Sequence, residues 1–167
     1  MISAVSSDNL YVLLHYASQA PEGCFVEVGV WRGGTAFHLQ EMRTLFAYDT
    51  FEGMPFAEEE DYHPVGDFSD TDYSLVKRLL NRSTVVKGIF PNSAVEMPPV
   101  AFAHIDCDQY KSIYDSAKYL SDKMATGGIM YFDDYGYSHL PLATKAVDDL
   151  FGDRVEVIEN GKAIVRF

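Results

Sequence analysis

The segment Phe25-Val-Glu-Val-Gly-Val-Trp-Arg-Gly-Gly-Thr35 decides the fold of this chain. It begins as an apolar run that reaches Gly29, and Gly33-Gly34-Thr35 then opens a helical pattern. This order predicts a buried strand, a tight turn that glycine permits, and a helix whose first N–H groups point at the space beyond the strand. The segment therefore predicts a ligand site at the end of the first strand.

Three kinds of ligand site begin with a glycine turn of this kind. A P-loop requires lysine after its last glycine, where this chain has Thr35, and a dinucleotide fingerprint requires glycine where it has Trp31. The third kind binds a nucleoside without phosphates, a description that adenosylmethionine meets. We expect Glu27 in the strand and Asp49 at the end of the next strand to hold it, Asp49 through both ribose hydroxyls. The alternative is a turn that serves only packing, with Asp49 as a cap or loop residue.

Strand and helix patterns alternate along the rest of the chain. The expected strands are Cys24–Val30, Leu45–Phe51, Thr84–Phe90, Val100–Cys107 and Gly128–Asp133, and the expected helices are Asn9–Gln19, Thr35–Arg43, Thr71–Asn81, Tyr110–Met124 and Leu142–Phe151. Two further short runs, 154–158 and 162–167, flank Asn160-Gly161, which is a strong hairpin signal. We therefore expect one α/β domain over residues 1–167, with a Rossmann-like, doubly wound, mostly parallel sheet and a C-terminal antiparallel hairpin. Class I methyltransferases have this strand inventory.

Composition and charge narrow the choice of partners. The 167 residues are 47% hydrophobic, which suits one core, and a formal net charge of −12 without a basic cluster argues against nucleic acid and anionic membranes. Cys24 and Cys107 each lie in an apolar run, which favours two buried thiols over a disulfide. The sequence shows no leader-like segment and no apolar run of about 18 residues. We therefore expect a cytoplasmic protein, and formation of a homo-oligomer stays open.

Acidic residues gather where the fourth and fifth strands end. Asp106 and Asp108 are two residues apart, so both face the same way on an extended chain, and Asp133-Asp134 ends the fifth strand. If the two strands are neighbours, three or four carboxylates converge at one edge of the sheet. Either some of them are protonated, or a hard divalent ion such as Mg²⁺, Ca²⁺ or Mn²⁺ neutralises them. Asp108 can instead cap the helix that is expected to begin near Tyr110.

Five motifs together resemble the macrocin O-methyltransferase (TylF-like) family of class I S-adenosylmethionine-dependent methyltransferases. The motifs are Phe25-Val-Glu-Val-Gly-Val-Trp-Arg-Gly-Gly34, Tyr48-Asp-Thr-Phe-Glu-Gly-Met-Pro55, His104-Ile-Asp-Cys-Asp-Gln-Tyr-Lys-Ser112, Gly127-Gly-Ile-Met-Tyr-Phe-Asp-Asp-Tyr-Gly136 and Ala143-Thr-Lys-Ala-Val-Asp148. They run over most of the chain in the order that the family has. The resemblance implies methyl transfer from S-adenosylmethionine to a hydroxyl of a small molecule, such as a sugar or phenolic natural product, assisted by a divalent metal such as Mg²⁺.

The resemblance also implies which residues form the site. Those that match the family's metal ligands are Asp106, Asp133 and Asp134, and Asp108 matches its proposed base. The cofactor positions carried over are Glu27, Gly29, Thr35, Asp49, Phe51, Gly88 and Phe90, the last two near the adenine. His104 and Cys107 depart from the residues expected around the two aspartates of the fourth strand.

The carboxylates suggest a hypothesis for the reaction. A metal ion binds the acceptor hydroxyl and lowers its pKa, Asp108 removes the proton, and the alkoxide attacks the methyl group in line. His139 and Lys111 are other candidate bases, whereas His104 is expected to be a hydrogen-bonded core residue. One rival is a metal-dependent glycosyl- or phosphotransferase, which the missing phosphate cradle disfavours. The other rival is a non-catalytic protein that binds the same cofactor.

The segment Glu52–Asp70 has no strand or helix pattern. It is long for a loop in so compact a chain, and it carries the acidic run Glu58-Glu-Glu-Asp61. We expect either a lid over the site or a disordered acidic excursion.

Overall fold

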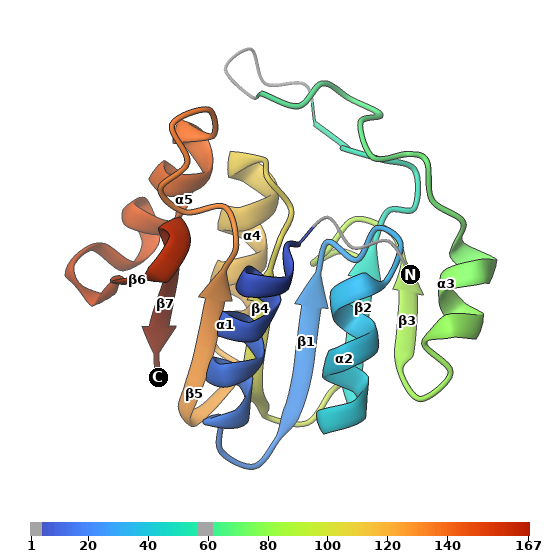
Figure 1. Ribbon diagram of the computed structural model, residues 1–167, viewed down its shortest axis with the longest axis horizontal. Coiled ribbons are helices and arrows are strands. Elements are labelled where there is room, and N and C mark those ends of the chain that lie inside the picture. The colour runs from blue at the N-terminus through green and yellow to red at the C-terminus, as the bar shows by residue number, and fades with distance from the viewer. Residues whose placement is uncertain (1–4, 57–61) are drawn as a thin grey trace.

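The computed structural model describes residues 5–56 and 62–167, and within them seven strands form one sheet (Figure 1). The strands are β1 Cys24–Val28, β2 Leu45–Asp49, β3 Thr84–Lys87, β4 Val100–Ile105, β5 Met124–Phe132, β6 Glu156–Ile158 and β7 Lys162–Arg166. Their order across the sheet is β3-β2-β1-β4-β5-β7-β6. The first five are parallel, and β7 is antiparallel to both of its neighbours. The doubly wound sheet with its terminal hairpin, expected from the sequence, is thereby confirmed.

Helices cover both faces of this sheet. They are α1 Ser7–Ser18, α2 Gly34–Met42, α3 Tyr73–Leu79, α4 Tyr110–Ser121 and α5 Pro141–Phe151, and two short 3-10 helices, η1 Gly152–Arg154 and η2 Glu159–Gly161, flank β6. Buried residues of α1, α2 and α3 pack on one face, together with strand residues such as Phe25 and Phe102. Those of α4 and α5 pack on the other face with Val26 and Ile105. Because neighbouring strand residues point to opposite faces and both faces are covered, the central strands β1, β2 and β4 are mostly apolar and almost entirely buried.

The fifth strand differs from its expected bounds. It begins at Met124 rather than Gly128, and α4 accordingly ends at Ser121. Met124 pairs with Val100, but Ile129 pairs with Phe102, so β5 carries extra residues against β4. A bulge of this kind depends on the partner strand, which no local pattern in β5 reveals.

The hairpin expected at Asn160-Gly161 is present. Both residues have left-handed backbone angles, with φ of 59° and 69°, and Ile158 pairs with Lys162 across the turn. Left-handed residues in succession are what Asn-Gly accommodates best, which explains the strength of the sequence signal. The turn places Lys162 at the start of β7, beside the end of β5.

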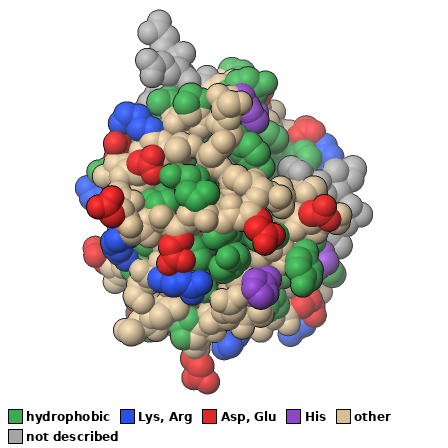
Figure 2. All heavy atoms as spheres, turned by 60° about the vertical axis from the view of Figure 1, so that its left-hand side comes forward, with side chains coloured by type: hydrophobic (Ala, Val, Ile, Leu, Met, Phe, Trp, Pro, Cys, Tyr) green, Lys and Arg blue, Asp and Glu red, His purple; other side chains and the backbone are tan. Residues whose placement is uncertain are grey.

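The surface and the cysteines agree with the composition. On the face shown in Figure 2, the described Lys and Arg side chains lie singly among acidic and apolar ones rather than in a continuous basic patch. No helix among the described residues has the length and apolar character needed to cross a membrane. Cys24 and Cys107 are free thiols, Cys24 buried and Cys107 half-buried.

The segment Glu52–Asp70 is described except for residues 57–61, which include the acidic run. Its described parts are joined to each other, because the Met54 N–H donates to the Asp67 carbonyl at 2.9 Å and the Gly66 N–H donates to the Met54 carbonyl at 3.1 Å. Figure 1 shows the segment above the edge of the sheet at which the parallel strands end. The described parts therefore lie where a lid over that edge would lie.

Candidate active site

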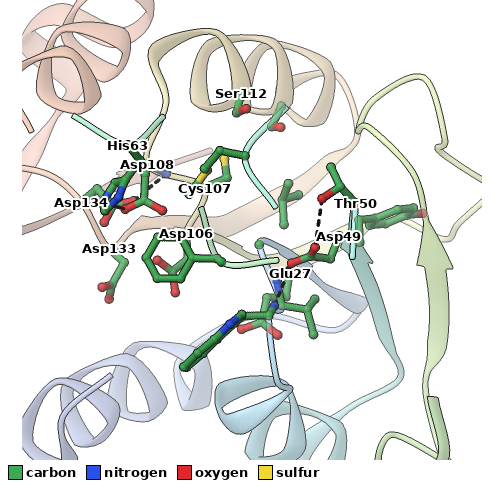
Figure 3. Close-up of a pocket in the computed structure, with 18 of the residues that line it drawn as sticks. Glu27, Asp49, Thr50, His63, Asp106, Cys107, Asp108, Ser112, Asp133 and Asp134 are labelled. Carbon is green, nitrogen blue, oxygen red and sulfur yellow. Dashed lines mark hydrogen bonds and ion pairs between the residues drawn. The ribbon is translucent and has the colours of Figure 1, made fainter. Parts of the chain in front are cut away.

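A cavity of about 310 Å³ opens beyond the carboxyl ends of β1, β2, β4 and β5 (Figure 3). Parallel α/β sheets bind ligands at this edge. The cavity is lined by ten of the eleven site residues expected from the sequence, namely Glu27, Gly29, Thr35, Asp49, Gly88, Phe90, Asp106, Asp108, Asp133 and Asp134. Phe51 is the one that does not line it. Its side chain is 6% exposed and packs against Tyr73, with ring centroids 5.2 Å apart.

The glycine turn lies directly against the end of β4. Gly29 has φ of +92°, and a Cβ atom at this position would lie 1.6 Å from the backbone oxygen of Asp106. Only glycine allows this approach. The turn therefore has a packing role as well as a place in the cavity wall, and it brings the expected cofactor half of the site next to the carboxylates.

Asp49 holds the same turn in place. Its Oδ2 accepts hydrogen bonds from the N–H groups of Val30 and Trp31 at 2.8 and 2.7 Å. Its Oδ1 accepts from the N–H of Phe51 at 2.6 Å. Trp31 and Phe51 both have positive φ, 47° and 52°, which is uncommon outside glycine and is stabilised here by the carboxylate. Asp49 thus fixes the turn, in addition to the role expected for it in ribose binding.

Glu27 and His104 form a buried pair beneath the cavity. Glu27 is 1% exposed and His104 is fully buried, and Glu27 Oε1 lies 2.9 Å from His104 Nδ1. Burial alone lowers the pKa of His104, but Asp133, Glu27 and Asp106 outweigh it and raise the pKa to about 10. The raised pKa favours the protonated ring, and the contact with Glu27 makes His104 the hydrogen-bonded core histidine that the sequence predicts. The second oxygen of Glu27, Oε2, is buried and has no hydrogen-bond partner among the described residues.

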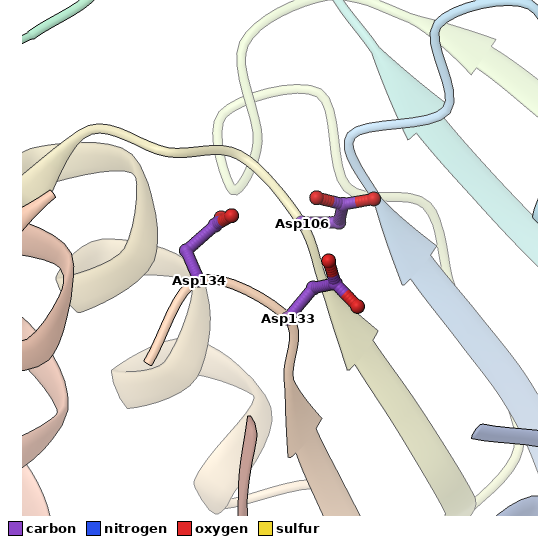
Figure 4. A group of neighbouring side chains, drawn as sticks. All are labelled: Asp106, Asp133 and Asp134. Carbon is purple, nitrogen blue, oxygen red and sulfur yellow. The ribbon is translucent and has the colours of Figure 1, made fainter. Parts of the chain in front are cut away.

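Three aspartates meet at the ends of β4 and β5 (Figure 4). Asp106, Asp133 and Asp134 each offer a carboxylate oxygen, and these oxygens lie within 4.8 Å of one another. Asp133 and Asp134 are buried, and Asp133 Oδ1 has no hydrogen-bond partner among the described residues. The expectation that these carboxylates converge is confirmed, because β4 and β5 are neighbours in the sheet.

The three aspartates change one another's pKa. Burial, followed by the charges of Asp133 and Asp134, raises the pKa of Asp106 well above its usual 3.8. Burial and Asp133 raise the pKa of Asp134 to about 6. Burial also pushes the pKa of Asp133 upward, but His104 and Lys162 outweigh it and hold this pKa below its usual value. Two of the three carboxyl groups are therefore costly to ionise without a further positive charge.

Asp108 lies beside this cluster in a left-handed conformation, with φ of 53°. Its N–H donates to Asp134 Oδ2 at 3.1 Å, and its Oδ1 lies 3.7 Å from Nε2 of His63. The residue at the N-cap of α4 is Gln109, one position later than the expected cap. A strained backbone at a cavity wall is typical of functional sites.

The other candidate bases lie in different places. His139 lines the cavity, and its ring is 5.3 Å from that of Tyr62 and 5.4 Å from that of Tyr137. Lys111 is not a lining residue and pairs with Asp115 at 2.6 Å on the surface of α4.

Three residues at the site were not expected from the sequence. His63 lines the cavity from the segment Glu52–Asp70, and Gln109 is buried next to Asp108. Lys162, 1% exposed, donates to both the backbone and the side chain of Asp133. Gln109 belongs to the motif that runs from His104 to Ser112, so the sequence could have indicated it. His63 and Lys162 lie in stretches that match no motif.

Comparisons with known proteins agree on one family. Residues 2–157 match the family described as Macrocin-O-methyltransferase (TylF). Demethyldecarbamoylnovobiocin O-methyltransferase of Streptomyces niveus is 28% identical, over 76% of this chain and 57% of that protein. The 8-demethyl-8-(2,3-dimethoxy-alpha-L-rhamnosyl)-tetracenomycin-C 4'-O-methyltransferase of Streptomyces olivaceus is 25% identical, over 81% of this chain and 62% of that protein. The chain thus spans less than two thirds of the length of these relatives.

Solved structures show the same fold. The O-methyltransferase NovP superposes with a TM-score of 0.85 at 21% identity, over 98% of this chain and 81% of NovP. The calicheamicin methyltransferase CalS11 gives a TM-score of 0.76 at 18% identity, over 95% of this chain and 77% of CalS11.

Proposed function

The chain belongs to the macrocin O-methyltransferase (TylF) family, and from this premise we propose that it moves a methyl group from S-adenosylmethionine to a hydroxyl of a small sugar or phenolic molecule, assisted by a divalent metal. The observation that carries the proposal is that one cavity joins the glycine turn to the carboxylate cluster. Gly29 packs on the backbone of Asp106, so a methyl donor on the turn and an acceptor at the carboxylates are neighbours. Reaction by direct transfer requires this proximity.

The cofactor half of the cavity fits adenosylmethionine. Glu27 Oε2 is a buried carboxylate oxygen without a partner among the described residues, and a ligand ammonium group can supply its hydrogen bond. The α2 helix begins at Gly34, so its free N–H groups face the same space. Gly88 and Phe90 close the other side, where we place the adenine. Asp49 fixes the turn and keeps acceptor capacity for a ribose hydroxyl.

The carboxylate half of the cavity fits a divalent cation. Asp106, Asp133 and Asp134 offer only oxygen ligands, which suits Mg²⁺. Asp133 Oδ1 has no hydrogen-bond partner among the described residues, and it lies 3.9 Å from His104 Nε2. The raised pKa values of Asp106 and Asp134 have the direction expected where a positive charge is missing. When bound, such a cation lowers the pKa of a hydroxyl that it touches.

The remaining work belongs to the protein's own residues. Asp108 lines the cavity beside the three aspartates and can take up the hydroxyl proton. No acid is needed for the sulfur to leave, because the leaving group is a neutral thioether. Met54 and Phe68, from the segment above the cavity, cover it with apolar surface and exclude water.

The test combines calorimetry with a screen of acceptors. Adenosylmethionine and Mg²⁺ are titrated into the full chain, and sugars and catechol-like phenols are then screened for methylation by mass spectrometry. We expect Asp108→Asn to keep its affinity for adenosylmethionine and to lose roughly 100-fold or more in kcat. Asp115→Asn, on the surface of α4, is the matched control and should behave as wild type.

Three results would contradict the proposal. Cofactor binding without methylation of any acceptor would favour a non-catalytic protein. Binding of a nucleotide sugar but not of adenosylmethionine would favour a glycosyltransferase. Full activity after removal of metal with a chelator would remove the cation from the reaction.

A further inference from the structure

The loop that follows β5 is fixed on two sides. Its Gly136 N–H donates to Thr144 Oγ1 of α5 at 2.9 Å, and the Leu140 N–H donates to the Tyr137 carbonyl at 3.0 Å. A Cβ at Gly136 would meet the Gly161 backbone at 3.5 Å, so the loop also lies against the terminal hairpin. These contacts hold the backbone at Tyr137, and Tyr137 lines the cavity.

Lys162 fixes the Tyr137 side chain from the hairpin. Its Nζ donates to the Asp133 carbonyl at 2.6 Å, to Asp133 Oδ2 at 2.7 Å and to the Tyr137 hydroxyl oxygen at 2.7 Å. An ammonium group has three hydrogens and no lone pair, so these three bonds use all of its hydrogens, and the Tyr137 oxygen can only accept. The direction of the hydrogen bond between the two side chains is thereby determined.

The hydrogen of the Tyr137 hydroxyl is left for another partner. A phenol donates one hydrogen and accepts through its lone pairs, and the Tyr137 oxygen already accepts from Lys162. No oxygen or nitrogen of the described residues accepts the Tyr137 hydrogen. Because Tyr137 is half-buried and lines the cavity, an oxygen of a bound ligand can accept it.

The position of Tyr137 indicates which ligand it serves. Glu27 and Gly29, in the proposed cofactor half, lie at the end of β1, whereas Tyr137 follows β5 and is bonded to β7, on the far side of β4. Two hydrogen bonds of 2.7 Å through Lys162 connect its oxygen to Asp133 Oδ2 of the carboxylate cluster. The hydroxyl of Tyr137 therefore lies in the half of the cavity that we assign to the methyl acceptor.

We propose that Tyr137 is a specificity-determining residue, which donates a hydrogen bond to the oxygen next to the hydroxyl that is methylated. The inference rests on the proposed function and names the class of methyl acceptor: a molecule with oxygens on two neighbouring carbons, such as a sugar diol or a catechol. Two such oxygens are about one hydrogen-bond length apart, so one can lie at the carboxylate cluster while the other meets Tyr137. Asp108 keeps its role toward the reacting hydroxyl, because Tyr137 uses only a lone pair of the neighbouring oxygen.

The experiment compares two ligands in two proteins. The full chain is loaded with S-adenosylhomocysteine, which has no methyl group to transfer. Calorimetry then measures the Kd of a methyl acceptor found in the screen and the Kd of its analogue without the neighbouring oxygen, as phenol lacks one oxygen of catechol. The preference of the wild type for the complete acceptor should fall by a factor of roughly 3 to 10 in Tyr137→Phe, which keeps the ring but has no hydrogen to donate.

A second tyrosine of the same loop provides the matched control. Tyr135 donates to Asp148 Oδ1 at 3.0 Å and does not line the cavity, so Tyr135→Phe should keep the wild-type preference. Adenosylmethionine should bind Tyr137→Phe as tightly as it binds the wild type, which also shows that this variant is folded.

Three results separate the possible errors. No preference in the wild type, or an unchanged preference in Tyr137→Phe, would overturn the inference. Weaker binding of adenosylmethionine to Tyr137→Phe, with the preference kept, would overturn it as well and assign the hydroxyl to the cofactor. If the wild type methylates no molecule in the screen, the proposed function itself fails, which is a different result from an active wild type without the preference.

Discussion

Lys162 Nζ lies 2.7 Å from Asp133 Oδ2 and 2.6 Å from the Asp133 backbone oxygen, so the terminal hairpin is bonded to a candidate metal ligand. The contact exists because β7 lies next to β5, with Ala163 paired to Phe132. Lys162 also donates to the hydroxyl of Tyr137, which lines the cavity, at 2.7 Å. Lys162 thus connects the end of β5 to the loop that follows it, through hydrogen bonds to Asp133 and Tyr137.

The first prediction concerns this lysine. Lys162→Met leaves the buried Asp133 with a weaker counter-charge, so we expect a loss of about 3–5 kcal/mol in the free energy of unfolding, measured by urea titration. Lys145→Met is the control, because Lys145 is exposed and pairs with Asp149 on the surface of α5. Equal losses of unfolding free energy in the two variants would show that the buried pair with Asp133 stabilises the fold no more than the exposed pair does.

The second prediction compares two glycines with similar backbone angles. Gly29 and Gly66 have φ of +92° and +88°, but a Cβ would meet the Asp106 oxygen at 1.6 Å in the first case and open space in the second. Gly66→Ala should therefore cost only the left-handed strain of about 1–2 kcal/mol. Gly29→Ala adds overpacking of about 1–3 kcal/mol. Because Gly29 packs against the Asp106 backbone, Gly29→Ala should also lose binding of both adenosylmethionine and Mg²⁺, as measured by calorimetry. Normal binding of both ligands would show that the glycine turn and the carboxylate cluster do not depend on this contact.

The third prediction concerns pH. Burial and Asp133 raise the pKa of Asp134 from its usual 3.8 to about 6, so between these values the folded protein holds a proton that the unfolded chain releases. Stability is then lost as the pH rises through this window. The shift corresponds to about 3 kcal/mol. In urea titrations without metal, the free energy of unfolding of the wild type should therefore fall by about 3 kcal/mol more than that of Asp134→Asn between pH 4 and pH 7.

Saturating Mg²⁺ provides the control for this pH effect. A cation on the cluster stabilises the ionised form, so the difference between wild type and Asp134→Asn should shrink or change sign at pH 7. A difference that is independent of both pH and Mg²⁺ would contradict the assignment of Asp134.

The fourth prediction concerns Asp49. Three backbone N–H groups donate to its carboxylate, so Asp49→Ala should weaken adenosylmethionine binding and also lower the unfolding free energy by about 1–3 kcal/mol. Asp70→Ala is the matched control, because the Asp70 carboxylate binds the same turn through the side chains of Trp31 and Arg32 at the surface, not through backbone N–H groups of the described residues. Loss of affinity in Asp49→Ala with no change in stability would show that the carboxylate serves the ligand alone.

Local patterns were sufficient for most of the fold. Apolar runs, helical spacing and Asn160-Gly161 report on the backbone of their own segment, so they predict the elements and their order. The start of β5 was misplaced because its bulge is set by pairing with β4. Phe51, for which a cofactor contact stays a prediction, does not line the cavity, and its ring packs on Tyr73 of α3, a neighbour that no spacing reveals.

The sequence by itself determined the sheet, the glycine turn and the set of carboxylates, because parallel strands bring their carboxyl ends to one edge whatever the details of packing. Only the tertiary structure decided what surrounds those carboxylates. Lys162 reaches Asp133 from a strand 29 residues away, and His63 reaches Asp108 from a loop without regular structure. Such contacts depend on how distant segments pack, and packing leaves no periodic trace in the residues that make it.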